Sequence, residues 1–277
     1  MSQTHASIAF FEMTQTDARF NHSTPELYDR YMGPLLFEPY AKLVAERAAL
    51  LQPARILETA TGTGIVTRAV SAAVPDAEIV ATDLNPGMLE FARQGHGSAR
   101  VEFQQADAQD LPFAAGSFDL VICQFGLMFF PDKVAANREA RRVLGSGGRY
   151  LFVSFDRLEH NPVPKAAEDA VAEMFPEDPP DYMERGPFSY ADPAVIEQDL
   201  RSAGFTDIQV ETIASSSRVD ARDAAHGLVL GSPFRAEIER RNSSGLDRAL
   251  DAVTEALQPW DGKDAPISAH VVTSTKE

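Results

Sequence analysis

Short apolar runs alternate with stretches of helical spacing along most of the 277-residue chain. Each run is of strand length, and most are separated by ten or more residues in which apolar positions recur every three or four. The runs that predict strands lie at 56–58, 79–83, 101–104, 118–123 and 149–155. Strands that alternate with helices in this way predict a parallel sheet covered by helices on both faces, which is an α/β fold.

Other segments extend the pattern on both sides of these runs. Apolar residues alternate over 207–213 and over 266–273, which predicts two more strands and seven in total. The helices that we expect lie at 26–50, at 65–70, in the segment that begins at Asn85, and at 133–144, 164–175, 192–203 and within 219–258. We expect the first of them to break near Gly33-Pro34, because proline cannot continue the helical hydrogen bonds. In the last, Glu237 and Arg241 are spaced as an i,i+4 ion pair on a solvated face.

A turn of small residues, 59–64, joins the first strand to its helix. Strand, tight turn and helix in that order are typical of a nucleotide site at the carboxyl end of a first parallel strand. Gly62 and Gly64 allow close approach of a ligand to the backbone, and the helix presents free N–H groups. The turn contains no phosphate-binding P-loop, and Thr67 takes the place of the third glycine of a dinucleotide fingerprint.

The second strand ends in an acid, Asp83, nineteen positions after Gly64. A carboxylate at the end of strand two is placed to accept hydrogen bonds from ribose hydroxyls. Asn85 and Pro86 then fit the cap and the first turn of a helix. The alternative is an ordinary acid at a strand end. Together, the turn and Asp83 predict a nucleoside-containing ligand.

The stretch from 50 to 155 resembles class I S-adenosylmethionine (SAM) methyltransferases, among them the ubiquinone- and menaquinone-biosynthesis type. Their first motif, an acid and a hydrophobe followed by G-x-G-x-G, corresponds to 58–64, with Glu58 for the commoner aspartate and Ala60 for the first glycine. The second motif corresponds to DLNPGML at 83–89. Similar blocks follow at 107–119, D-A…LPF…SFD, and at 143–152, VLGSGGRYLF. The order and spacing of the four blocks carry the resemblance.

The resemblance implies a role for each matching residue. Glu58 would hold the methionine amino group, directly or through water, and the amino-acid end would lie against Gly62 and Gly64. Asp83 would bind the ribose, while Asp107 and Ala108 would bind the adenine edge. The other residues expected at the cofactor are Tyr28, Ala60, Leu84, Met88, Gln124 and Phe125. For Tyr28 the alternative is packing of the N-terminal helix, and for Asp107 it is a solvated loop.

An apolar loop, 124–130, follows the fourth strand. We expect Phe125, Met128, Phe129 and Phe130 to be buried, either in plain packing or as the lining of a site near the transferred methyl group. The quinone-biosynthesis enzymes often carry histidine around this loop, and this chain has none there. His160, shortly after the fifth strand, is a candidate general base, with a solvated loop residue as the alternative. Cys123 fits a small buried hydrophobe, and His270 fits a structural residue.

The fold that the resemblance implies is a seven-stranded, Rossmann-like, doubly wound sheet with its last strand antiparallel and with helical cap elements. Four regions follow: an N-terminal helical cap at 1–49, a SAM-binding core at 50–155, an acceptor-pocket insertion at 156–190, and the C-terminal half of the sheet with added helices at 191–277. The first 25 residues are irregular and polar, with Phe10 and Phe11 as exceptions.

Composition narrows the class of partner. The formal charge of −16 argues against nucleic acid and anionic membranes, since both need clustered Lys and Arg. No run approaches the roughly 20 apolar residues of a membrane span, and no signal peptide is visible. One cysteine suits a reducing cytoplasm, and the scattered histidines indicate no metal site. The sequence indicates no oligomeric state.

These observations predict a cytoplasmic SAM-dependent methyltransferase that transfers the methyl group to a small-molecule acceptor by direct in-line displacement. The loop at 124–130 favours an apolar or aromatic acceptor. Two other classes remain open. A non-catalytic SAM-binding protein would carry the same motifs, and a dinucleotide-dependent oxidoreductase is permitted by the first turn and by Asp83.

Overall fold

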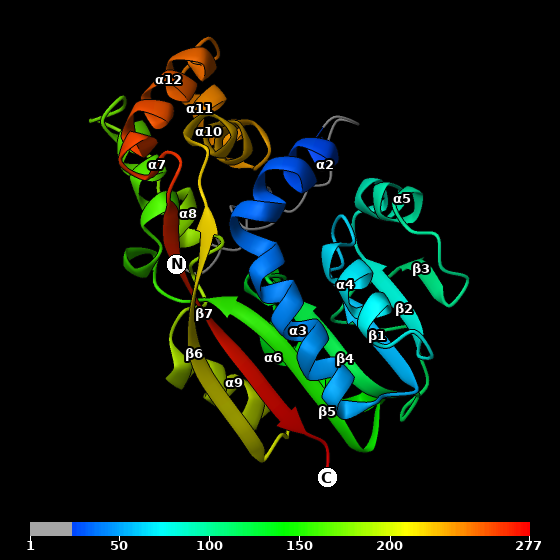
Figure 1. The fold of residues 1–277 in the computed structure, drawn as a ribbon. Coiled ribbons are helices and arrows are strands. Elements are labelled where there is room, and N and C mark those ends of the chain that lie inside the picture. The colour runs from blue at the N-terminus through cyan, green and yellow to red at the C-terminus, as the bar shows by residue number, and fades with distance from the viewer. Residues whose placement is uncertain (1–23) are drawn as a thin grey trace.

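A single mixed sheet organises the computed structural model, which describes residues 24–277 (Figure 1). The strand order is β3-β2-β1-β4-β5-β7-β6. The strands are β1 (Arg55–Thr59), β2 (Glu78–Asp83), β3 (Val101–Gln105), β4 (Phe118–Gln124), β5 (Leu144–Phe155), β6 (Asp207–Arg218) and β7 (Asp264–Thr275). The first five strands pair in parallel, and β7 runs antiparallel to both β5 and β6. The expected doubly wound α/β fold is therefore confirmed.

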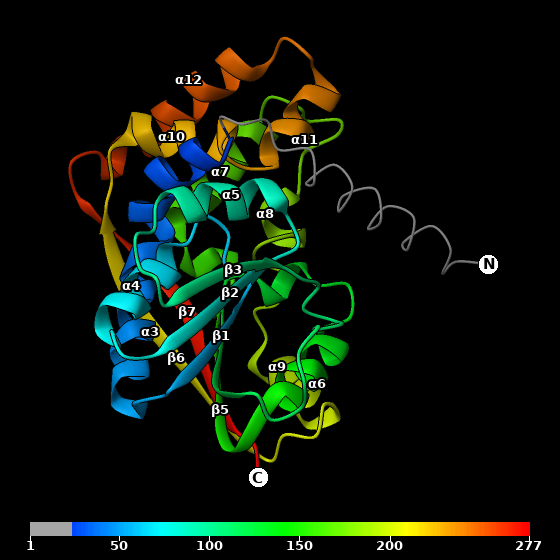
Figure 2. The ribbon, with the colours of Figure 1, turned by 90° about the vertical axis from the view of Figure 1, so that its right-hand side faces the viewer.

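Helices cover both faces of the sheet (Figure 2). On one face lie α3 (Glu38–Leu51) and α4 (Ile65–Ala73), and on the other lie α6 (Lys133–Val143) and α9 (Pro193–Ser202). A further helix, α5 (Pro86–Gln94), follows β2. Its cap matches the expectation, because the Asn85 side chain accepts from the N–H of Gly87 at 2.8 Å. Strand β4 is buried on both faces, which explains its nearly continuous apolar sequence.

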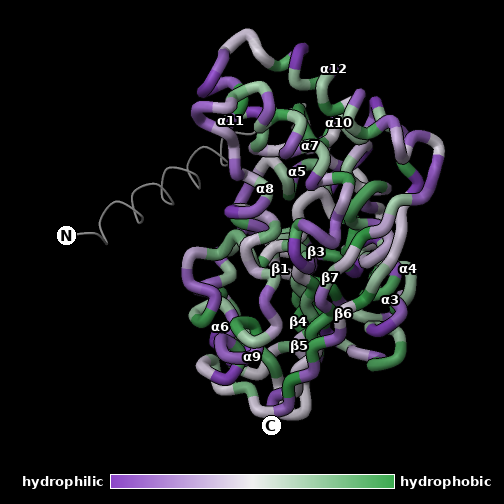
Figure 3. The backbone as a smooth tube through the Cα atoms, turned by 90° about the vertical axis from the view of Figure 1, so that its left-hand side faces the viewer, coloured by the Kyte–Doolittle hydropathy of each residue, from purple (hydrophilic) through white to green (hydrophobic). Residues whose placement is uncertain are grey.

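A helical cap stands over the edge at which the parallel strands end (Figures 1 and 2). Three separate stretches of chain build it. They contribute α2 (Thr24–Leu27) and η1 (Tyr28–Phe37); η3 (Leu158–His160), α7 (Pro162–Ala172) and α8 (Tyr182–Arg185); and α10 (Ala221–Leu230), α11 (Phe234–Arg241), α12 (Leu246–Leu257) and η4 (Gln258–Trp260). In Figure 3, hydrophobic segments gather along the strands, and hydrophilic ones mark the outer turns of the cap.

The expected break near Gly33-Pro34 is wrong. The chain continues through η1, a π-helix, directly into α3. In a π-helix the N–H of each residue bonds the carbonyl five residues back, and the N–H of Glu38 does so to Gly33 O. The wider turn accommodates Pro34, which lacks an N–H, so the helix stays continuous where an α-helix would kink.

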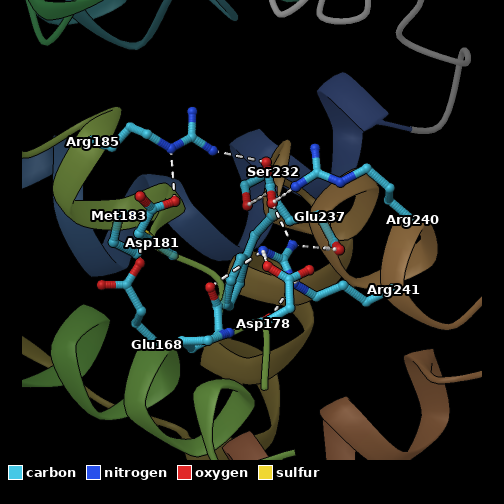
Figure 4. Close-up of polar contacts among 11 residues, drawn as sticks. Glu168, Asp178, Asp181, Met183, Arg185, Ser232, Glu237, Arg240 and Arg241 are labelled. Carbon is cyan, nitrogen blue, oxygen red and sulfur yellow. Dashed lines mark hydrogen bonds and ion pairs between the residues drawn. The ribbon is translucent and has the colours of Figure 1, made fainter. Parts of the chain in front are cut away.

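The expected solvated pair in α11 is a buried cluster (Figure 4). Glu237 and Arg241 do pair at i,i+4, with Nη1 of Arg241 2.5 Å from Oε2, but their side chains are only 7% and 6% exposed. Arg185 of α8 reaches the other oxygen of Glu237 at 2.9 Å, and Arg241 donates to the carbonyl of Asp178 at 2.6 Å. The Pro-rich segment around 178–185 covers this face of α11, and the sequence pattern gave no sign of that contact.

Strands β5, β6 and β7 extend furthest beyond the expected bounds. Strand β5 begins five residues early because the glycine-rich segment makes ladder bonds: Gly147 N–H donates to Lys276 O, and Lys276 N–H donates to Gly148 O. Strand β6 continues five residues further toward the cap than expected, and β7 is two residues longer at each end. The expectations for residues 1–23, including Phe10 and Phe11, lie outside the described residues. Within 24–277, none of the helices combines the length and apolar character needed to cross a membrane.

Candidate functional site

The turn between β1 and α4 is held in a left-handed conformation. Ala60, Gly62 and Gly64 have φ values of 53°, 55° and 80°. Glycine adopts such angles without strain, but alanine does so at a cost of roughly 1–2 kcal/mol. A Cβ at Gly62 would meet nothing within 4 Å, so the backbone there borders open space. The strained turn at a strand end, next to that space, is where backbone can approach a ligand.

Glu58 lies at the bottom of this turn, only 3% exposed. Its two oxygens accept hydrogen bonds from the hydroxyls of Thr61 at 2.9 Å and Thr67 at 2.7 Å. Burial raises the pKa of Glu58 to about 7, although these two hydroxyls act against the rise. Thr67, which replaces the third glycine of a dinucleotide fingerprint, thus has a positive role in fixing Glu58.

Asp83 ends β2 beside the same turn. Its Oδ2 accepts from the N–H of Gly62 and its Oδ1 from the N–H of Asn85, both at 2.8 Å. Burial raises the pKa of Asp83 above its ordinary value, and these backbone donors oppose the rise. Each carboxylate oxygen has a second lone pair, which is available to a ligand hydroxyl. Tyr28 of η1 lies close by, since burial and then the Asp83 charge raise its pKa.

The predicted adenine residues stand at the next strand end. The N–H of Ala106 donates to Asp83 O at 3.2 Å, which brings the segment after β3 against the end of β2. Asp107 accepts from the N–H of Gln109 at 2.8 Å, and its backbone bridges to Asp110. Ala108 is half-buried in this turn. Leu84 is 61% exposed between the two strand ends, a large apolar side chain without cover, whereas Met88 is buried.

Two buried polar atoms near the turn lack hydrogen-bond partners. Gln124, at the end of β4, donates its amide to Phe37 O at 3.0 Å, but its Oε1 has no partner. The hydroxyl of Thr63, in the glycine turn, has none either. A buried polar group without a partner costs free energy, on the order of 1–3 kcal/mol. A ligand that carries a donor, such as an ammonium group, would satisfy Gln124 Oε1.

Phe125 is the second strained residue at the edge, with φ of 53°. Its ring stacks on Phe155 at a centroid distance of 3.9 Å and meets Phe37 at 5.8 Å. Phe37 stacks on Tyr28 at 4.9 Å, and Phe155 meets Phe188 at 4.7 Å. We call these five rings the aromatic row. It crosses the carboxyl edge from η1 to the insertion after β5.

The loop after β4 is less buried than expected. Phe125 and Met128 are buried, but Phe129 is 37% exposed and Phe130 is intermediate. The short 3-10 helix at 127–129 turns the Phe129 ring outward, so the expectation that it is buried is wrong. Cys123 is fully buried, and burial raises the pKa of its thiol to about 11, as expected for a small hydrophobe.

His160 lies in η3, after β5, with its side chain 59% exposed. Its Nδ1 is 2.7 Å from Oδ2 of Asp156, which is 8% exposed. The other histidine in this region, His270, is buried and bonds to Ala191 O through Nε2, so it has the expected structural character. His160 is thus at the same edge of the sheet as the turn, on the far side of β4.

Sequence reasoning missed several residues that shape this edge. Asp156 directly follows a parallel strand, so the rule that found Asp83 could have found it. Thr61 and Thr67 were read only as turn and helix residues, and no pattern marks a buried hydroxyl pair. Phe37 and Phe155 join the aromatic row through tertiary packing alone. Among the described residues no group of His, Cys, Asp and Glu is arranged as a metal site.

Comparison with known proteins agrees with this geometry. Residues 57–152 match a methyltransferase domain. This domain contains the turn, Asp83, Asp107 and β4. A demethylmenaquinone methyltransferase of Deinococcus radiodurans is 35% identical over 132 residues, which are 47% of this chain and 55% of that protein. The family resemblance inferred from sequence is therefore confirmed, although the chain spans only about half the length of that relative.

Solved structures extend the fold comparison beyond the methyltransferase domain. Phosphoethanolamine N-methyltransferase 2 of Haemonchus contortus, solved with S-adenosylhomocysteine, has a TM-score of 0.60 at 19% identity, over 97% of this chain and 60% of that one. The [4+2]-cyclase SpnF has a TM-score of 0.60 at 22% identity, over 87% of this chain and 81% of that one. Identities this low show a shared fold alone.

Proposed function

We propose that this protein transfers a methyl group from SAM to a small-molecule acceptor. The observation that carries the proposal is the arrangement at the carboxyl edge. Three features lie together at this edge: a left-handed turn that leaves open space at Gly62, the Asp83 carboxylate at the end of β2, and the Gln124 oxygen without a hydrogen-bond partner. The match of residues 57–152 to the methyltransferase domain supports the same conclusion.

The residues present fit the cofactor piece by piece. The amino-acid end of SAM would lie along Gly62 and Gly64, where Oε1 of Gln124 can accept from its ammonium group. The ribose hydroxyls would donate to Asp83. The adenine would lie against the exposed Leu84 side chain, with its edge toward Asp107 and the N–H of Ala108.

The remaining predicted residues support these contacts. Both carboxylate oxygens of Glu58 are already bonded to threonine hydroxyls, so we propose that it orders the turn and reaches the ammonium group through water. Tyr28 would cover the ribose from the cap, Met88 would pack beneath it, and Ala60 would keep the left-handed turn. Phe125 would back the methionine chain, and its aromatic face favours a sulfonium cation nearby.

Bound SAM supplies an electrophilic methyl group on a positively charged sulfur. The chain itself has to bind, align and dehydrate the two reactants. Alignment of two reactants in one site can lower a barrier by roughly 7–11 kcal/mol. Four of the five rings of the aromatic row are buried, so the row and the cap helices would exclude water there, and the row favours an apolar or aromatic acceptor. We place this reaction in the cytoplasm, because a chain with one cysteine cannot form an internal disulfide, which suits a reducing compartment.

Turnover tests the proposal. The purified protein is incubated with SAM and a panel of oxygen, nitrogen, carbon and sulfur acceptors, and S-adenosylhomocysteine and methylated product are measured by mass spectrometry. We expect stoichiometric formation of both with at least one aromatic acceptor. Binding of SAM without product from any acceptor class would point instead to a non-catalytic SAM-binding protein. Hydride transfer to or from a nicotinamide cofactor would contradict the proposal.

A further inference from the structure

The turn after β5, residues 156–161, is fixed by a set of buried and partly buried hydrogen bonds. Oδ2 of Asp156 accepts from the hydroxyl of Ser268 at 2.8 Å and lies 2.7 Å from Nδ1 of His160. Oδ1 of Asp156 accepts from the N–H of Arg157 at 2.7 Å. The aspartate therefore joins the turn to β7 and to His160 at once.

Asn161 completes the fixation. It is fully buried, and its amide nitrogen, which carries two N–H groups, lies 3.1–3.3 Å from the carbonyl oxygens of Asp156, Arg157 and Ser268. Its own oxygen accepts from the N–H of Ser268 at 3.0 Å. Several buried polar groups thus hold one turn on the sheet, while the histidine that the turn carries remains 59% exposed.

The charge of Asp156 decides how His160 is protonated. Burial alone would raise the pKa of Asp156, but hydrogen bonds from His160, from the Arg157 N–H and from Ser268 hold it below its ordinary value. Asp156 is therefore a carboxylate at neutral pH and can only accept hydrogen bonds. Nδ1 of His160 must carry the proton in their bond, which leaves the lone pair of neutral His160 on Nε2.

Asp156 and His160 lie on the side of the site where we place the methyl acceptor. Phe155, directly before Asp156, stacks on Phe125, directly after Gln124. Two residues of the proposed SAM site, Gly62 in the turn after β1 and Asp83 at the end of β2, lie on the opposite side of β4. An acceptor bound beside the aromatic row would have the methyl donor, SAM, on one side and the turn of His160 on the other.

We propose that His160, oriented by Asp156, is the general base of the transfer reaction, and that the acceptor is an aromatic molecule with a hydroxyl group. The inference rests on the proposed function and adds the chemical class of the acceptor. Asp156 is a positioning residue, and His160 is the catalytic one. A neutral hydroxyl is a poor nucleophile until its proton is removed, whereas a thiol ionises readily without help.

The transfer conserves atoms and charge. The hydroxyl oxygen bonds to the methyl carbon while its proton passes to Nε2 of His160. The carbon–sulfur bond breaks, and its electron pair stays on sulfur, which becomes a neutral thioether. The imidazolium then releases the proton to solvent, because the His160 side chain is exposed.

The first test compares two acceptors that share an aromatic frame, 1-naphthol and 1-naphthalenethiol. With naphthol, His160→Gln is expected to lower kcat about 10²- to 10⁴-fold, with the KM for SAM unchanged. With the thiol, kcat should change less than threefold. The matched control is His226→Gln, in which the histidine lost is bonded to Arg222 O rather than to a carboxylate, and we expect wild-type kcat from it.

The second readout does not depend on turnover. Nitrogen-15 NMR of the protein with S-adenosylhomocysteine, assigned through the loss of one signal in His160→Gln, should show His160 protonated on Nδ1. In Asp156→Ala the tautomer should shift toward Nε2–H, and calorimetric binding of S-adenosylhomocysteine checks that this variant is folded. If it does not fold, His160→Gln alone keeps the test decisive, because that side chain is largely exposed.

Three results would overturn the inference. One is a His160→Gln variant that keeps wild-type kcat with naphthol. Another is an equal loss with naphthol and thiol, which indicates a structural role. The third is wild-type protein that binds SAM but does not methylate naphthol, which would leave the proposed function standing. Failure of wild-type protein to bind SAM would instead refute the proposed function itself.

Discussion

At the scale of single residues, the site depends on two backbone strains and one close approach. Ala60 and Phe125 both have φ near +53° at neighbouring strand ends. Gly126, next to Phe125, lies so near Ala60 that an added Cβ would be 2.4 Å from the Ala60 Cβ and 3.0 Å from Cys123 Sγ. Residues in strained conformations cluster at functional sites, where the surrounding structure holds them in place. Here the contact between Ala60 and Gly126 packs the ends of β1 and β4 against each other.

This contact predicts a coupling between two substitutions. Gly126→Ala should lower the free energy of unfolding by about 1–3 kcal/mol through overpacking. Ala60→Gly relieves the left-handed strain and should be neutral or stabilising. In the double variant the main clash is gone, so at least about 0.5 kcal/mol of the loss should be recovered.

Urea denaturation of the four proteins in the cycle measures this coupling. The matched control is Gly97→Ala, because a Cβ there meets nothing within 4 Å, and it should leave stability nearly unchanged. Strict additivity of the two changes would show that the Ala60–Gly126 contact does not exist in solution.

At the scale of elements, the core strands and the cap helices were predictable, but the contacts within the cap were not. Each core strand carries its own signal, such as the apolar run of β4 or the acid that ends β2. The cap is held together by contacts between segments that are distant in sequence. Charged residues that make these contacts have the sequence pattern of solvent-exposed ones. Glu237 and Arg241 show this best. Their spacing correctly predicted that they pair, but the expectation that the pair is exposed was wrong. Likewise η1 kept Pro34 inside a helix by widening its turns, which local propensity does not encode.

The Glu237 cluster predicts where the cap is fragile. Glu237→Gln removes the buried carboxylate that pairs with Arg241, which keeps only the largely exposed Asp178 as a counter-charge. Breaking a buried pair typically costs about 3–5 kcal/mol. We expect a loss of that order in the free energy of unfolding, measured by urea denaturation. Glu239→Gln is the matched control on the same helix, because its pair with Arg235 is exposed and worth about 1 kcal/mol or less. Equal losses from the two variants would contradict the role of the buried cluster.

At the scale of the whole molecule, the sheet has a layout that other solved structures share, and the chemistry of the site depends on the segments added around it. The [4+2]-cyclase SpnF shares the fold, which illustrates that fold alone does not fix the reaction. The residues proposed to bind SAM, from Glu58 to Asp107, were predictable from sequence because they lie at or next to strand ends or in a turn of small residues. The acceptor half depends on Asp156, Ser268 and the aromatic row, which converge only in three dimensions.

Two buried acids give the molecule a defined dependence of stability on pH. Burial raises the pKa of Glu58 and of Glu168 to about 7, from an ordinary value of 4.5. The folded state therefore binds more protons than the unfolded state between these values, so stability falls as pH rises from about 4.5 to 7 and then levels off. The free energy of unfolding should be lower at pH 8 than at pH 5.

Glu168→Gln isolates one of the two contributions. Glu168 accepts from the N–H of Met183 at 2.6 Å (Figure 4), and glutamine can keep that bond without ionising. One pKa unit corresponds to about 1.4 kcal/mol, so the variant should reduce the decline between pH 5 and 8 by on the order of 1–3 kcal/mol. A decline as steep as that of the wild type would show that Glu168 does not titrate in this range.

The most direct measurement is calorimetric titration of the protein with SAM, S-adenosylhomocysteine and NAD. The wild type should bind the two adenosyl ligands and not NAD. Asp83→Asn should weaken that binding about 10- to 100-fold, since hydrogen bonds to a charged group are worth about 1.5–3 kcal/mol. The matched control is Asp76→Asn, the same change at an exposed residue just before β2 begins. This variant should bind the ligands as the wild type does. Binding of NAD alone, or equal affinity for SAM in Asp83→Asn and the wild type, would contradict a SAM site at this edge of the sheet.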